Sequence, residues 1–130
     1  MALFDVFVPL LKSRLPGLKF AGPSGAPPQI TISGIHPEVG DIVFYDDGDE
    51  ITVLVGHFTH SHFSNYDQVP IPEKEQAIAE QTVTFLEDLF SDRIVMWGSH
   101  GTSGGWRSID YKEDKARKKR EYLWSGPRNA

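Results

Sequence analysis

The residues best suited to chemistry are the histidines of the run His57-Phe-Thr-His-Ser-His-Phe63. If the chain is extended there, His60 and His62 point to the same face, because side chains alternate along a strand. Two imidazoles at this spacing can bind one zinc or iron ion, and His57 joins them as the candidate metal set. A metal ion with an open coordination position would activate water, which predicts a hydrolase. Further candidate ligands, if the fold brings them near, are His36, Asp67 and His100.

The same segment supports a second interpretation, a protein-binding surface at residues 57–67. Histidines and aromatic residues are neighbours there, and histidines on such a surface make pH-sensitive contacts. The candidate binding residues of this segment and of the chain around residues 98–107 are Phe58, His60, His62, Phe63, Tyr66, His100, Trp106 and Arg107.

A third interpretation concerns the segment from Gly98 to Gly105, which has four glycines in eight residues. Exposed backbone N–H groups of such a segment can bind an anion. Arg107 beside it could clamp a carboxylate or phosphate, with the indole of Trp106 as a platform. This pattern indicates a binder of small anions or nucleotides, although the Gly-Lys-Ser/Thr of a phosphate loop is missing.

Composition excludes several function classes. The chain has 130 residues and no cysteine, which removes disulfides, zinc–thiolate sites, iron–sulfur clusters and thiol catalysis. The net charge of −5 combines two unlike regions. Residues 1–110 hold six basic and fifteen acidic residues, a balance of −9, whereas residues 111–130 hold seven and three, a balance of +4. An acidic body repels phosphate backbones, so we expect no nucleic acid on the folded domain.

The sequence also predicts where the protein works. No apolar run approaches the ~20 residues of a membrane span, so we expect no membrane insertion. The first residues lack a basic region and a small-residue cleavage site, so they do not form a secretory signal. Together with the lack of cysteine, this predicts a cytoplasmic protein.

Hydrophobic spacing predicts helices near residues 4–15 and 73–90. Asp5 is expected to cap the first helix, with Pro9 in or near its first turn. Strands are predicted at residues 29–33, 93–97 and 106–111, and a hairpin at residues 41–45 and 50–55 around an Asp-Gly turn. Both faces of the hairpin are largely apolar, which predicts a central position in a sheet covered on both sides. The proline- and glycine-rich residues 16–28 are predicted to be a loop.

This order predicts an α+β fold with one mixed or antiparallel sheet of about five strands. Residues 1–111 form the single domain, and residues 112–130 form a basic tail that is partly helical, over residues 112–122, or flexible.

The leading interpretation is a small acidic, non-enzymatic protein-interaction domain, similar to an inhibitor or antidote, which binds a protein partner and suits a basic one. The metal-dependent hydrolase and the anion binder remain alternatives. No cofactor is predicted beyond the divalent metal of the hydrolase, and a homo-oligomer stays open. If residues 57–67 and 98–106 share one end of the sheet, a pocket there is the first choice of functional site.

Overall fold

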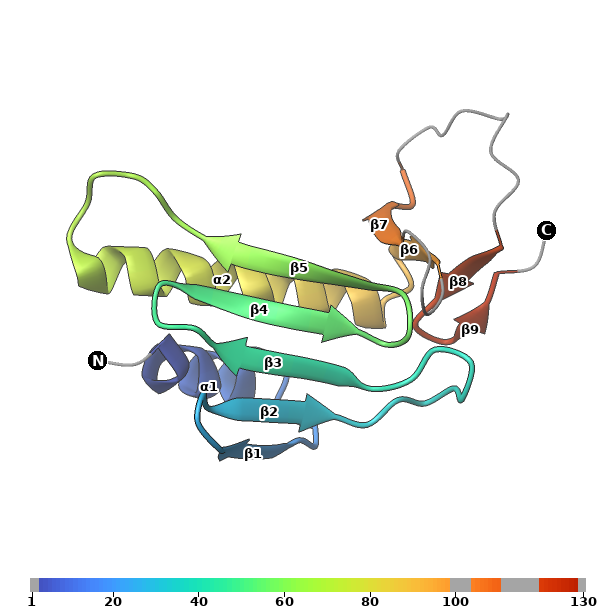
Figure 1. Cartoon of the computed structure of the whole chain (residues 1–130), viewed down its shortest axis with the longest axis horizontal. Coiled ribbons are helices and arrows are strands. Elements are labelled where there is room, and N and C mark those ends of the chain that lie inside the picture. Colours follow the sequence, from blue (N-terminus) through green and yellow to red (C-terminus); the bar gives the residue numbers. More distant parts are fainter. Residues whose placement is uncertain (1–2, 99–103, 111–119, 129–130) are drawn as a thin grey trace.

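Five consecutive strands pair in sequence order to form the main sheet of the computed structural model, which describes residues 3–98, 104–110 and 120–128 (Figure 1). Every pair is antiparallel, so the sheet is a meander of hairpins. The predicted hairpin supplies its third and fourth strands, and the histidine run supplies the fifth. The strands are β1 (Ala21–Ser24), β2 (Gln29–Ile32), β3 (Ile42–Asp46), β4 (Glu50–Val55) and β5 (Thr59–Ser64).

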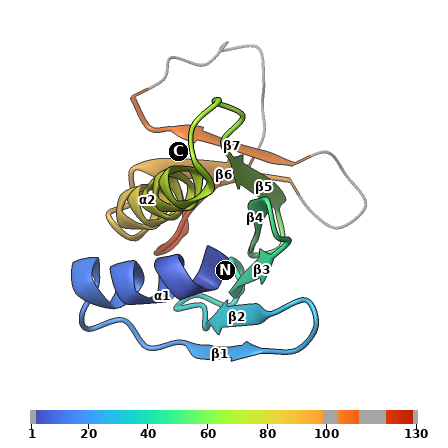
Figure 2. The same cartoon turned by 90° about the vertical axis from the view of Figure 1, so that its left-hand side faces the viewer.

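Within residues 3–98, 104–110 and 120–128, helices cover only one face of this sheet (Figure 2). The side chains of β3 alternate, with Ile42 and Phe44 fully buried and Val43 and Tyr45 half-buried on the outer face. The prediction of a sheet covered on both sides was therefore wrong. It failed because apolar side chains such as Leu54, which is 39% exposed, also occupy the open face.

The covered face packs against two helices, α1 (Leu3–Arg14) and α2 (Ile71–Phe90), which lie side by side (Figure 2). Both predicted helices are thus confirmed. α1 buries Phe7, whose ring lies 5.4 Å from that of Phe44 in the sheet. Pro9 lies beyond the first turn of α1, contrary to the prediction, and it is exposed.

Residues predicted to be a loop include the edge strand β1. It has only four residues, all of them exposed, and its register with β2 shifts between Ala21 and Ser24. Pro23 fits this position because an edge strand needs hydrogen bonds along only one side.

The later strands form a second sheet instead of extending the first. Its strands run in the order β7 (Gly105–Ser108), β6 (Ile94–Trp97), β8 (Glu121–Leu123) and β9 (Gly126–Pro127). The fold class is therefore α+β, as predicted, but with two sheets. Trp124, between β8 and β9, is buried and packs against Phe90 at the end of α2.

The predicted basic tail can be compared with the structure only in part. Residues 112–119 lie outside the described residues. Glu121 and Tyr122, the end of the predicted tail helix, belong to strand β8. Within the described part of the chain, no helix is both long enough and apolar enough to cross a membrane.

Candidate functional site

From Thr59 onward the histidine run is an extended strand, as the metal interpretation required for His60 and His62. His60 and His62 lie on the outer face of β5, opposite Leu54 and Thr52 of β4, and their ring centroids are 5.2 Å apart. The Nδ1 atom of His62 lies 3.0 Å from a carboxylate oxygen of Glu50 and 3.1 Å from the hydroxyl of Thr52. The predicted shared face is therefore present, and a carboxylate lies beside one of the two histidines.

His57 is separated from this pair by its position in the turn between β4 and β5. It lines a cavity of about 390 Å³ together with His36 and Asp41. Across residues 3–98, 104–110 and 120–128, no three His, Asp or Glu side chains gather closely enough to hold a metal ion. His100, a candidate third ligand, lies outside the described residues.

Phe58, a predicted binding residue, belongs to the core. It is 8% exposed, and its ring stacks on Tyr122 at 4.5 Å. This contact joins the turn before β5 to the second sheet. Tyr66, by contrast, is 88% exposed in the segment between β5 and α2.

The remaining aromatic residue of the run, Phe63, meets Trp106 at one groove. Both residues line a cavity of about 530 Å³ between α2 and the strands β5 and β7. Phe85 of α2 lies between them, with ring centroids 5.4 Å from Phe63 and 4.8 Å from Trp106. Residues 57–67 and the strand that follows the glycine-rich segment thus supply walls of the same cavity. We call this cavity the aromatic groove.

One side of α2 forms the polar wall of the aromatic groove. Its residues there recur every three or four positions, as they must to share one side of a helix. They are Ala77, Glu80, Gln81, Thr84 and Asp88.

The charge of the aromatic groove is negative. Glu80 accepts a hydrogen bond from Gln76, and neither Glu80 nor Asp88 forms an ion pair with a described residue. Glu87 is different, because it pairs with Arg14 of α1. No basic residue lines the groove among the described ones. The groove therefore combines three aromatic rings with two carboxylates.

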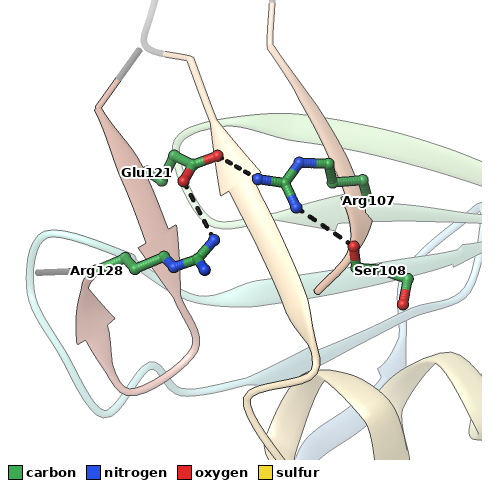
Figure 3. Close-up of polar contacts among 4 residues, drawn as sticks. All are labelled: Arg107, Ser108, Glu121 and Arg128. Carbon is green, nitrogen blue, oxygen red and sulfur yellow. Dashed lines mark hydrogen bonds and ion pairs between the residues drawn. The ribbon is translucent and has the colours of Figure 1, made fainter. Parts of the chain in front are cut away.

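Arg107 lies on the other face of β7 from Trp106, because the two are successive strand residues. One guanidinium nitrogen of Arg107 donates to a carboxylate oxygen of Glu121 at 2.6 Å, and another donates to the carbonyl oxygen of Ser108 at 3.4 Å. Arg128 approaches the second oxygen of Glu121 at 3.2 Å (Figure 3). The side chains of Arg107 and Glu121 are only 13% and 21% exposed.

This geometry separates the two parts of the proposed anion clamp. The indole of Trp106 does not lie under the guanidinium of Arg107, and Glu121 already engages that guanidinium. Residues 99–103 of the glycine-rich segment lie outside the described residues. The arrangement of Arg107, Glu121 and Arg128 joins β7 to β8 and β9.

Sequence reasoning missed Glu80 and Asp88, the carboxylates of the aromatic groove. The spacing of Ala77, Glu80, Gln81, Thr84 and Asp88 shows that they share one helix side, but not which strands face it. A clearer signal was available for Glu75, which recurs with Ile78 and Thr82 on the apolar stripe. An acidic residue at such a position is buried with the stripe, and Glu75 is 5% exposed.

No protein-family model, no curated protein and no solved structure matches this chain.

Proposed function

We propose that this protein is a non-enzymatic interaction domain whose aromatic groove binds a basic segment of a protein partner. The observation that carries the proposal is the meeting of Phe63 and Trp106, 43 positions apart in the sequence, at one groove whose helical wall bears Glu80 and Asp88.

The chemistry of this groove suits a lysine or arginine side chain. A cation over an aromatic face is attracted by the ring quadrupole, most strongly over tryptophan. The carboxylates of Glu80 and Asp88 would pair with the same cation or with its neighbours along the partner segment. Such a groove disfavours acidic segments, since their charges would face two carboxylates.

The charge of the whole domain supports the same partner. The balance of −9 over residues 1–110 attracts a basic protein and raises its association rate. Neutralising a basic partner is the role of an inhibitor or antidote, and it requires no reaction at the surface.

NMR titration tests the proposal directly. The probe is a synthetic peptide of alternating lysine and alanine, and the reference is a glutamate–alanine peptide of the same length. We expect the lysine peptide alone to shift the amide signals of Phe63, Phe85 and Trp106 and of the α2 residues between them. The binding should weaken as salt is added, because the attraction is electrostatic.

Charge reversal on α2 supplies matched variants. The double variant Glu80→Lys with Asp88→Lys should abolish binding, whereas the double variant Glu38→Lys with Glu73→Lys makes the same charge change outside the groove and should retain most of the affinity. If both double variants lose the same affinity for the lysine peptide, the binding depends only on net charge, and the aromatic groove is not a specific site. Signal shifts confined to other surfaces would refute it as well.

A further inference from the structure

A third cavity lies at the opposite end of α2 from Trp106, beside the start of α1. Its volume is about 310 Å³, and the first turns of both helices, the β3–β4 turn and the segment after β5 line it. Leu3, Ile71 and Ile78 give it apolar walls. The exposed Tyr66 also lines this cavity.

A carboxylate without a protein partner among the described residues lines the cavity. Glu75 lines it and is only 5% exposed, yet it forms no hydrogen bond or ion pair with any described residue. The Glu75 oxygens are not among the fully buried polar atoms of the described residues that lack a partner, so they open into the cavity, where a solute can reach them. Lys74 lines the same cavity but forms no ion pair with Glu75.

We infer that this cavity binds a small organic amine, with the ammonium group on Glu75 and the hydrocarbon against Leu3, Ile71 and Ile78. A charge-assisted hydrogen bond to Glu75 supplies the partner that the carboxylate lacks. Asp49, on the β3–β4 turn, adds a second negative charge to the lining. Tyr66 offers a ring face to the cation or to an aromatic group of the ligand. This site is independent of the aromatic groove.

Calorimetric titration with phenethylamine tests the inference, with phenylethanol as the uncharged analogue of the same shape. We expect the amine to bind and the alcohol to bind at least about tenfold more weakly, since only the amine pairs with the carboxylate. The variant Glu75→Gln preserves the side-chain volume and should weaken amine binding by about tenfold or more. Glu73→Gln removes a charge from the exposed side of the same helix end and should leave the affinity unchanged.

Tyr66→Ala keeps the test valid if the Glu75 variant does not fold. Tyr66 is 88% exposed, so its loss should not unfold the protein, but it should weaken the binding of phenethylamine. Trp106→Ala should leave that binding intact, which separates this site from the aromatic groove. A parallel titration with Nα-acetyl-lysine methylamide distinguishes two sources of the amine. Tighter binding of the lysine derivative indicates a lysine side chain of a protein, and tighter binding of phenethylamine indicates a free amine.

The inference is overturned if neither amine binds. Equal affinity for phenethylamine and phenylethanol would also overturn it, as would unchanged amine affinity in both Glu75→Gln and Tyr66→Ala.

Discussion

The carboxylate of Asp46 accepts a hydrogen bond of 3.0 Å from the backbone N–H of Phe4, which lies 42 positions earlier in the chain. The other carboxylate oxygen accepts from the backbone N–H of Gly48, also at 3.0 Å. Asp46 is 6% exposed. One side chain thus caps α1 and fixes the turn between β3 and β4, and it joins the first helix to the centre of the sheet.

Replacing Asp46 should therefore destabilise the protein through two unpaired backbone groups. We expect Asp46→Ala to lower the free energy of unfolding by about 1–3 kcal/mol, because a helix cap and a buried hydrogen bond are lost together. Urea denaturation measures the change. Asp49→Ala, an exposed acidic residue of the same turn, should change stability by less than about 0.5 kcal/mol. Similar values for both variants would contradict the role of Asp46.

The aromatic groove predicts a difference between two of its rings. Phe85 is 4% exposed and touches both Phe63 and Trp106, so Phe85→Ala should cost about 3–5 kcal/mol in unfolding free energy. Trp106 is half-buried, so Trp106→Ala should cost less but should weaken the binding of a lysine-rich peptide. Thermal unfolding and peptide titration on the same samples separate the two effects. A Trp106→Ala protein of unchanged peptide affinity would show that the indole takes no part in binding.

Two ion pairs of different burial predict a contrast between two glutamates. Glu121 pairs with Arg107 in a largely buried position, whereas Glu38 lies 3.6 Å from Arg120 on the surface. Glu121→Ala leaves a guanidinium without its carboxylate and should cost about 1–3 kcal/mol. Glu38→Ala should cost less than about 1 kcal/mol, as exposed pairs do. Chemical denaturation of both variants checks this order, and the reverse order would contradict it.

Two glycines with positive φ predict unequal effects of the same substitution. A Cβ on Gly56 (φ +55°) would lie 1.9 Å from the carbonyl oxygen of Val39, whereas a Cβ on Gly48 (φ +90°) would meet no atom within 4 Å. Gly48→Ala should cost roughly 1 kcal/mol, the cost of the backbone conformation. Gly56→Ala should cost at least about 2 kcal/mol more, because a backbone atom must move. Equal midpoints of unfolding for the two variants would contradict this prediction, because they would show that the backbone at Val39 moves at no cost in stability.

Local patterns predicted most of the elements. Helical spacing located α1 and α2, and the Asp-Gly turn located the hairpin of β3 and β4, because these signals arise between near neighbours in the chain. The hydrogen bond from the backbone N–H of Phe4 to Asp46 was not predictable in this way, because only the folded sheet brings Asp46 near the start of α1. The expectation that Asp5 caps α1 stays a prediction.

In the candidate site, too, local patterns predicted some features, whereas others depend on contacts between distant parts of the chain. The alternation of His60 and His62 on one face follows from strand geometry alone. The burial of Phe58 and the meeting of Phe63 with Trp106 depend on how the second sheet packs against the first, which no local pattern encodes. Apolar residues on the open face, such as Val43 and Tyr45, gave the hairpin a sequence pattern that is typical of a sheet covered on both sides.

The short, proline-containing strand β1 is poorly suited to strand pairing between molecules. A long flat edge strand is a template on which the strand of a second molecule can pair, and this leads to aggregation. β1 has four residues, an irregular register and Pro23, while β5 at the opposite edge contacts β7. The meander thus offers a poor template for strand pairing at its β1 edge, although its outer face is open and partly apolar.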